Sequence, residues 1–144
     1  MLISKGFYEL TPDEIFDIFK ARCDIFVVEQ DCPYPEVDAY DKIARHIALY
    51  EEKTLLAYCR LLPKGSRFDD VSIGRVLATE RRRGYASEVT REAIRVAREE
   101  WHAERIRLDA QTYAIPFYEK LGFSVTSEEF LEDGIPHVEM MLYC

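Results

Sequence analysis

The sequence predicts a single domain, residues 1–144, with a mixed α/β fold whose sheet comes mostly from the middle of the chain. Its 144 residues suit one domain and suffice to bury a hydrophobic core. Hydrophobic residues make up 48% and charged residues 32%, with six Gly and six Pro, which is typical of a globular protein. Segments with the apolar spacing of strands alternate with segments that have the spacing of helices.

The first part of the chain predicts a strand, a helix and a loop. Residues 2–10 have the pattern of a short strand. The tetrapeptide TPDE that follows combines a Thr N-cap, a Pro at the first helical position and a Glu three residues after the cap, so a helix begins there. Apolar residues recur at helical spacing after this start, which predicts that the helix continues to about Glu29. Two prolines make residues 31–41 a loop with room for a short helical turn.

The middle of the chain is predicted to be mostly strand. Residues 45–63 have the pattern of two strands around a turn at residues 51–53. Residues 71–78 are rich in β-branched side chains and predict a further strand.

A second long helix is predicted to begin near Ala86. Its apolar face consists of residues at helical spacing: Val89, Ala93, Ala97 and Trp101. The rest of the chain predicts a strand, a short helix ended by Gly122 and a last strand, at residues 105–110, 114–122 and 137–144.

The charge pattern argues against nucleic acid as a partner. The formal net charge is −8, and much of the positive charge lies in residues 81–107. Because nucleic-acid binding rests on neutralising phosphates, such a chain should repel nucleic acid over most of its surface. A small anion held at one place fits this pattern better.

We expect neither a membrane-spanning helix nor a secretion signal in this sequence. No apolar run approaches the ~20 residues that a membrane-spanning helix needs, so no membrane partner is expected. Residues 1–14 contain no uninterrupted apolar core, and we expect no signal peptide. The four cysteines lie far apart without a CxxC pair, which predicts free thiols in a reducing cytoplasm and no metal site.

The segment RRRGYASEV, residues 81–89, follows a predicted strand and opens a predicted helix. The first N–H groups of a helix have no intrahelical partners, and the helix dipole places positive charge there. With Gly84 allowing close approach to the backbone, the segment predicts an anion site, although its spacing alone fits a solvated basic turn equally well. The phosphate motifs GxxxxGK(S/T) and GxGxxG are absent.

Several motifs resemble those of the GNAT acetyltransferase superfamily. Arg81-x-x-Gly84-x-Ala86 is similar to its (Q/R)xxGx(G/A) pyrophosphate loop, and AQTYAIPFYEKLGF is similar to a second signature, in which a strand end leads into A-x-x-F-Y-x-x-x-G-F. Further matches point to the ElaA-like group: FVVEQDCPYPEVDAYD, ARHIALY, YCRLLP, GRV and EDGIPHVEMM. In order along the chain, they extend from about Arg22 to the end.

The resemblance implies an acetyl-CoA-dependent N-acyltransferase with a mostly antiparallel sheet, splayed in the middle and flanked by helices. Backbone N–H groups from Arg82 through Ala86 would hold the pyrophosphate. Strand residues 76–78 would pair with the pantetheine arm and place an N–H near the thioester oxygen, where it would stabilise a developing negative charge. The cofactor-binding residues implied in this way are Val76, Leu77, Ala78, Arg81, Arg82, Arg83, Gly84, Tyr85, Ala86, Phe117 and Gln111, which stands where family members often carry Asn.

The resemblance also implies two catalytic residues. Tyr118 would protonate the departing CoA thiolate; the alternative is that Phe117 and Tyr118 only anchor a short helix in the core. The attacking amine needs a base, and histidine, with an ordinary pKa of about 6.5, suits this role at neutral pH. His137 follows a turn at the place where the resembling groups put a histidine beside the thioester. The alternatives are that it is a hydrogen-bonded turn histidine, or that Glu29 acts as base through a water molecule.

The sequence leaves the acceptor open. The acidic loop 29–41 would attract a cationic amine such as a polyamine, an aminoglycoside or a basic peptide end, whereas Arg75 would pair with the carboxylate of an amino-acid-like amine. We therefore take Glu29, His46 and Arg75 as candidate substrate contacts, with His46 equally explained as a structural histidine. The expected partner is a small-molecule or peptide amine, and the protein is expected to be a monomer or homodimer.

A different class of function is a non-catalytic module that binds acyl-CoA as a sensor. A pure binder needs only the pyrophosphate loop, so Tyr118 and His137 in their motifs favour the enzyme.

Overall fold

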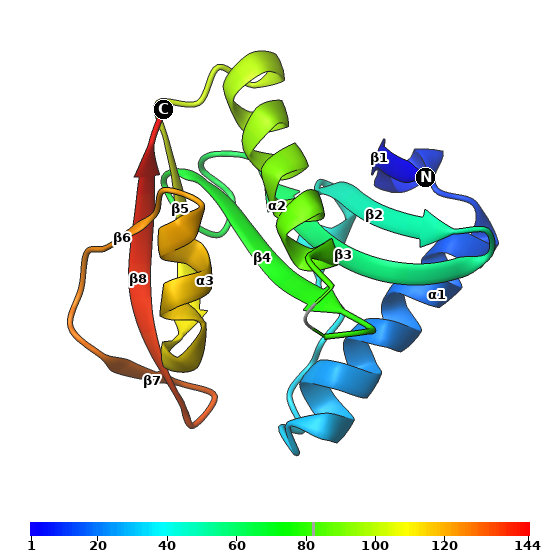
Figure 1. Cartoon of the computed structure of the whole chain (residues 1–144), viewed down its shortest axis with the longest axis horizontal. Coiled ribbons are helices and arrows are strands. Elements are labelled where there is room, and N and C mark those ends of the chain that lie inside the picture. Colours follow the sequence, from blue (N-terminus) through cyan, green and yellow to red (C-terminus); the bar gives the residue numbers. More distant parts are fainter. Residues whose placement is uncertain (82) are drawn as a thin grey trace.

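The computed structural model describes residues 1–81 and 83–144. In this part of the chain, eight strands form one mixed sheet with the spatial order β1-β2-β3-β4-β5-β8-β6 (Figure 1). The remaining strand, β7, pairs with the first three residues of β8. The strands are β1 (Leu2–Gly6), β2 (Arg45–Glu51), β3 (Thr54–Leu62), β4 (Val71–Ala78), β5 (Arg105–Gln111), β6 (Ser124–Val125), β7 (Phe130–Glu132) and β8 (Ile135–Tyr143). The α-helices are α1 (Pro12–Arg22), α2 (Tyr85–Arg95) and α3 (Ile115–Lys120).

Two hydrophobic clusters cover the two faces of the sheet. The α2 and α3 helices pack on one face, where Val89 and Ala93 are fully buried against residues such as Ile47. The α1 helix packs on the other face, where Ile18 is fully buried beside Tyr58. Successive residues of a strand point to opposite faces, so β2 and β3 contribute to both clusters. The flanking helices and mostly antiparallel sheet confirm the predicted fold.

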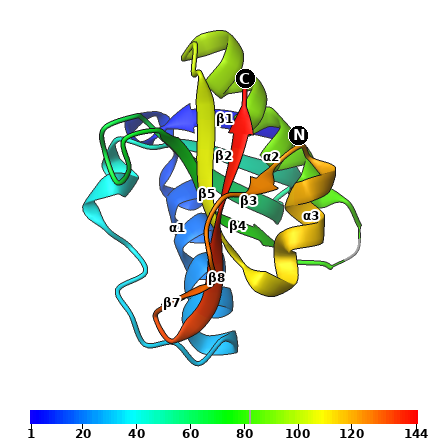
Figure 2. The ribbon, with the colours of Figure 1, turned by 90° about the vertical axis from the view of Figure 1, so that its left-hand side faces the viewer.

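The sheet divides between β4 and β5, the one parallel pair among the described strands. These two strands pair at Val71 with Ile106 and at Ser72 with Arg107. Beyond that point they diverge, and Figure 2 shows β5 and β8 running across the direction of β2 and β3. The predicted splay is therefore present, and it opens at the end of β4 that leads into the loop before α2.

The N-terminal helix begins as the sequence predicts. The Thr11 hydroxyl accepts from Glu14 N at 3.1 Å, and Glu14 Oε1 accepts from Thr11 N at 2.8 Å, which completes the capping box. The helix continues beyond α1 as π-helix, Cys23–Glu29, and thus ends at the predicted residue. The following loop is irregular apart from one 3₁₀ turn, Ala39–Lys42.

Some boundaries differ from the prediction. The first strand ends at Gly6 instead of residue 10, because the Glu9 carboxylate accepts from Gly6 N at 2.8 Å and closes a 3₁₀ turn, Phe7–Glu9. The sequence analysis missed β6 and β7, since strands of two and three residues are too short to show a period. Gly122 ends α3 as predicted, with a left-handed φ of 103°.

The four cysteines are free: Cys23, Cys32, Cys59 and Cys144. Among residues 1–81 and 83–144, no helix is both long and apolar enough to cross a lipid bilayer.

Candidate active site

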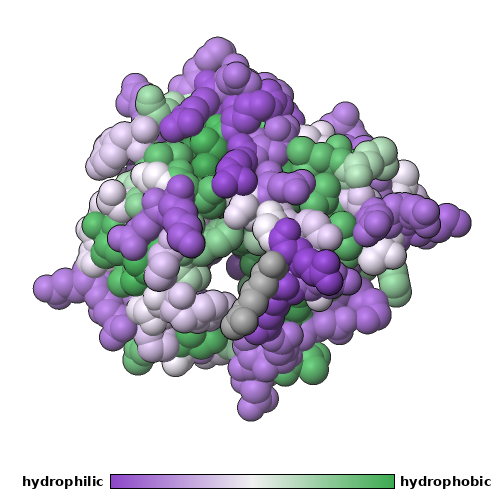
Figure 3. Space-filling view, viewed as in Figure 1, coloured by the Kyte–Doolittle hydropathy of each residue, from purple (hydrophilic) through white to green (hydrophobic). Residues whose placement is uncertain are grey.

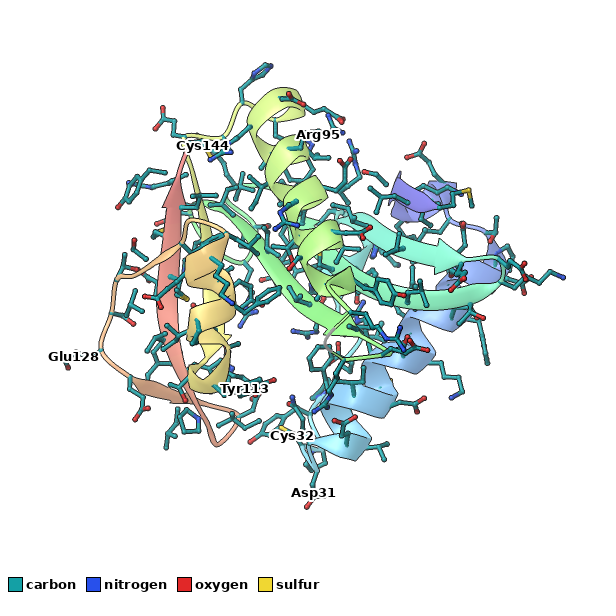
Figure 4. The ribbon with its side chains drawn as sticks, viewed as in Figure 1. Asp31, Cys32, Arg95, Tyr113, Glu128 and Cys144 are labelled. Atoms are coloured by element: carbon teal, nitrogen blue, oxygen red, sulfur yellow. The ribbon has the colours of Figure 1, made fainter. Side chains whose placement is uncertain are left out.

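A cavity of about 350 Å³ lies where β4 and β5 diverge. The cavity is lined by the part of β4 that no longer pairs with β5 and by the end of β5. The loop after the first helix and the turn before β8 complete the lining. Figure 3 shows the surface hollowed between the half that carries β5, β8 and α3 and the half that carries β4 and α1. Cys32 and Tyr113 lie at one end of it (Figure 4). Five predicted site residues line this cavity: Arg75, Val76, Gln111, Tyr118 and His137.

Tyr118 is one of the buried aromatic groups that line the cavity. It lies on α3, and its ring packs edge-on against Phe117, with centroids 5.0 Å apart, and against Phe123, at 6.0 Å. Burial raises the pKa of its hydroxyl, and the neighbouring Cys59 adds to this shift. Tyr118 therefore stays protonated at neutral pH and can donate a proton or a hydrogen bond into the cavity. The packing fits the core-anchor alternative as well, so geometry alone leaves both roles open.

His137 lies in β8, directly opposite Gln111 of β5. Its Nδ1 is 2.7 Å from the Ile135 carbonyl oxygen, which can only accept, so Nδ1 carries the proton in the neutral ring. The unprotonated nitrogen is then Nε2, which lies 3.5 Å from Glu132 Oε2. This geometry fits a base and a hydrogen-bonded turn histidine alike, and the sequence analysis missed the neighbouring Glu132.

The predicted anion site lies at the start of α2. Gly84 is the N-cap of this helix, with a left-handed φ of 76° and no side-chain cap. A Cβ added there would meet no atom within 4 Å among the described residues, so the backbone is open to a bulky group. Uncapped N–H groups at a helix start, beside Arg81 and Arg83, suit a pyrophosphate. Arg82, which the sequence analysis also assigned to this loop, lies outside the described residues.

The other predicted cofactor residues occupy different surroundings. Val76 lines the cavity, Leu77 is buried in the core cluster beneath α1, and Ala78 borders a groove next to Arg81. Gln111 Nε2 donates to Gln30 Oε1 at 3.2 Å and thereby links β5 to the end of the first helix. Tyr85, Ala86 and Phe117 are partly buried.

Two candidate substrate contacts do not line the cavity. His46 is fully buried, its Nδ1 lies 2.6 Å from the Tyr58 hydroxyl and its Nε2 lies 2.8 Å from the Asp41 carbonyl oxygen. Both ring nitrogens are occupied, so His46 has a structural role and is dropped as a substrate contact. Glu29 pairs with Arg81 at the start of the predicted pyrophosphate loop and borders the neighbouring groove. It is thus removed from the position that a base acting in the cavity would need.

Arg75, the third candidate, occupies an irregular part of β4. Arg60 of β3 pairs with Gly74 and Tyr58 pairs with Leu77, so two residues of β4 face the single residue Cys59. This is a β-bulge, and Arg75 within it has a φ of 54°. The left-handed region is costly for a residue with a Cβ, by about 1–2 kcal/mol.

A buried ion network surrounds the Arg75 side chain. It comprises three arginines and three carboxylates from α1, β3, β4 and the acidic loop: Arg22, Arg60, Arg75, Glu36, Asp38 and Asp41. Burial by itself would raise the pKa of Asp41, but hydrogen bonds and charge from Arg22 and Arg60 outweigh it and lower the pKa. The acidic loop is therefore largely neutralised by arginines here. Among the described residues, no group of three or more His, Cys, Asp or Glu side chains could hold a metal ion.

Comparison with known proteins shows the family of the chain. A family profile described as "Acetyltransferase (GNAT) domain" matches residues 20–144. The chain belongs to the GNAT acetyltransferase family. A UPF0039 protein of Schizosaccharomyces pombe is 40% identical, over 97% of this chain and 95% of its own. Protein ElaA of Escherichia coli is 34% identical, over 92% of this chain and 89% of its own.

Solved structures of related GNAT proteins have the same fold. An acyl-CoA N-acyltransferase from Pseudomonas aeruginosa superposes with a TM-score of 0.91 at 34% identity, covering 99% of both chains. The crystal structure of Escherichia coli ElaA gives 0.91 at 30% identity, covering 99% of this chain and 98% of its own. The GNAT fold binds acyl-CoA, which suits the loop at Gly84 and the open edge of β4.

Proposed function

We propose that this GNAT protein transfers an acetyl group from acetyl-CoA to a primary amine of a small molecule or peptide, by direct attack within a ternary complex. The proposal rests on one observation: Tyr118 and His137, the predicted acid and base, line one cavity with the β4 bulge. The start of α2, with its uncapped N–H groups, would hold the pyrophosphate. An acceptor amine would enter the remaining part of the cavity.

Each residue has a defined task in this proposal. The His137 Nε2, which lies 3.5 Å from Glu132 Oε2, takes the proton that an ammonium must lose before its nitrogen can attack. A backbone N–H of the β4 bulge donates to the oxygen that becomes negative as the amine adds to the thioester. The Tyr118 hydroxyl then donates its proton to the departing CoA thiolate, and the second proton that the nitrogen loses on becoming an amide restores the hydroxyl. Binding both substrates together brings the amine within reach of the thioester and removes the need for a covalent enzyme intermediate.

The proposal is tested by release of CoA thiol from acetyl-CoA in the presence of single amines. The panel contains a polyamine, an aminoglycoside, a basic peptide and several amino acids, and a reaction without amine corrects for the protein's own thiols. We expect at least one amine to release thiol, and initial rates at varied concentrations of both substrates to give intersecting lines. Tight binding of acetyl-CoA without release by any amine would instead support the sensor module.

The placement of the pyrophosphate is tested by Gly84→Val. A β-branched residue strongly disfavours the left-handed φ of Gly84, and its side chain would fill the open space beside the helix start. We expect calorimetry to show CoA affinity at least about tenfold weaker, because several backbone hydrogen bonds to the anion are lost together. Replacing any single arginine of this loop by Ala should weaken CoA binding less, since the backbone donors remain.

Gly65→Val is the matched control for this experiment. Gly65 has a φ of 79° and equally open surroundings, but it lies in the turn between β3 and β4. We expect this variant to lose stability and to retain CoA affinity. Equal affinity of the Gly84→Val variant and the parent would contradict the placement.

A further inference from the structure

The β4 bulge holds an arginine in a backbone conformation that arginine disfavours. Arg75 has a φ of 54° and lines the cavity together with Gly74 and Val76. A bulge leaves one peptide unit of the strand outside the regular ladder, so a backbone N–H becomes free to bind something else. Left-handed conformations of residues with a Cβ persist only where the surroundings enforce them. The left-handed conformation of Arg75 therefore needs a contact that holds its side chain in place.

Glu36 supplies that contact from the acidic loop. Its Oε2 accepts from Nε of Arg75 and from Nε of Arg22, the latter at 2.9 Å. Its carbonyl oxygen accepts from Nη2 of Arg22 at 2.9 Å and from Nη2 of Arg75 at 3.1 Å. The Glu36 side chain is only 8% exposed. One residue thus joins the C-terminal end of α1 to the bulge through four hydrogen bonds.

The other charges around Arg75 make this contact necessary. Burial and the neighbouring guanidinium of Arg60 lower the pKa of Arg75, and Arg22 adds to the effect, whereas Glu36 opposes it. Asp38 lies further away, 3.6 Å from Arg75 Nη2, and its carboxylate is already bonded by Arg60 through both oxygens. Without the Glu36 charge, Arg75 would keep only the more distant Asp38 as a carboxylate partner, beside the like charges of Arg60 and Arg22.

We propose that Glu36 is a positioning residue, which holds Arg75 and thereby keeps the β4 bulge in the conformation that points a backbone N–H at the carbonyl oxygen of the acyl thioester. This inference rests on the proposed function. Glu36 itself acts through Arg75 and need not touch either substrate. Its effect is therefore confined to the interaction with one oxygen atom of the thioester.

Two ligands that differ only in that oxygen provide the test. Acetyl-CoA carries the carbonyl group, and S-ethyl-CoA has a CH₂ group in its place. Calorimetry without amine gives the affinity for each, and thiol release monitors any hydrolysis. We expect the parent to bind acetyl-CoA about three- to tenfold more tightly, the value of one hydrogen bond between neutral groups. The Glu36→Gln variant should lose this preference and bind S-ethyl-CoA as the parent does.

Substitutions at Arg75 separate backbone conformation from side-chain contact. Arg75→Ala and Arg75→Gly both remove the side chain, but only Gly adopts a positive φ without strain. We expect the Gly variant to keep the preference for acetyl-CoA and the Ala variant to lose it. Adding Glu36→Gln to the Arg75→Gly variant should then leave the preference for acetyl-CoA over S-ethyl-CoA unchanged. This pair also decides the matter if Glu36→Gln alone does not fold.

Asp41→Asn serves as the matched control within the same network. It breaks the pairs with Arg22 and Arg60 and leaves Arg75 bound to Glu36. We expect it to unfold at lower temperature and to keep the preference for acetyl-CoA.

The outcomes distinguish this inference from the function on which it rests. If the parent binds neither ligand, the proposed function fails, and the inference fails with it. If the parent binds both but equally well, no N–H reaches the carbonyl oxygen and the inference alone is wrong. It is equally wrong if Glu36→Gln folds and keeps the preference, or if Arg75→Gly loses it as Arg75→Ala does.

Discussion

Tyr118→Phe is expected to reduce turnover about 10²–10⁴-fold, or slightly less, the range typical of general acid catalysis. The affinity for acetyl-CoA and the thermal stability should stay close to those of the parent. Phe keeps the ring and hence its edge-on packing against Phe117 and Phe123. The comparison therefore isolates the hydroxyl, and steady-state kinetics with an amine from the thiol-release panel measures it.

The physical reason lies in the charge that forms on sulfur. A thiol has an ordinary pKa of about 8.5 and a phenol one of about 10, so proton transfer from a tyrosine is uphill in water. Burial raises the pKa of Tyr118 further and keeps it protonated. A thiolate forming in the same partly desolvated cavity nevertheless gains strongly from the hydroxyl hydrogen bond. This interaction grows as the C–S bond breaks, so it lowers the barrier without tightening substrate binding.

Tyr58→Phe is the contrasting variant. Tyr58 is also buried, but its hydroxyl bonds to His46 Nδ1 at 2.6 Å, and neither residue lines the cavity. Its loss should lower the unfolding temperature and leave turnover unchanged, the reverse of the result for Tyr118. If Tyr118→Phe turns over at the parent rate, the hydroxyl is not the acid and Tyr118 is a core aromatic.

His137→Ala is expected to lower turnover by about 10²–10⁴-fold with little change in the affinity for acetyl-CoA. The variant should also change the pH dependence of the rate. A base works only when it is unprotonated, so the rate of the parent falls as the pH is lowered and the imidazole gains a proton. With the imidazole gone, we expect this acidic limb of the pH–rate profile to disappear or shift.

The hydrogen bonds of His137 define which nitrogen acts. Because the Ile135 carbonyl fixes the proton on Nδ1, Nε2 is the nitrogen that would act as base in the proposed reaction, and it lies 3.5 Å from Glu132 Oε2. His102→Asn is the control, since His102 is exposed after the second helix with a φ of 52° that Asn tolerates. An unchanged pH profile in His137→Ala would exclude it as the base and transfer the role to a carboxylate acting through water.

Much of the fold follows from local patterns that the sequence displays directly. The capping box at Thr11, the apolar face of the second helix at Val89 and Ala93, and the glycine that ends α3 each depend on residues within a few positions of one another. Short-range geometry and side-chain chemistry determine such features, and they need no knowledge of the rest of the chain. The anion site at Gly84 is likewise predicted from neighbouring residues, and the structure adds the left-handed conformation of Gly84 and the absence of a side-chain cap there.

The tertiary structure decided the arrangement of the cavity. The splay, the β4 bulge and the pairing of Glu132 with His137 all arise from strand register, which no periodicity in the sequence reveals. Glu36 shows this most clearly: in the sequence it is one charge in an acidic loop, and in the fold it bonds to arginines 14 and 39 positions away. For His46 the structure had the opposite effect: a candidate substrate contact in the sequence is a buried structural group in the fold.

The physical reason for this division is the range of the interactions. Helix caps, turns and amphipathic faces are set by neighbours along the chain, so the order of residues determines them. Ion pairs, strand register and burial depend on which distant segments meet, and that is a property of the whole packed sheet. The sequence therefore determined the fold and the presence of Tyr118, His137 and the pyrophosphate loop in their motifs. Only the packed structure decided that the first two share a cavity with an arginine held by Glu36.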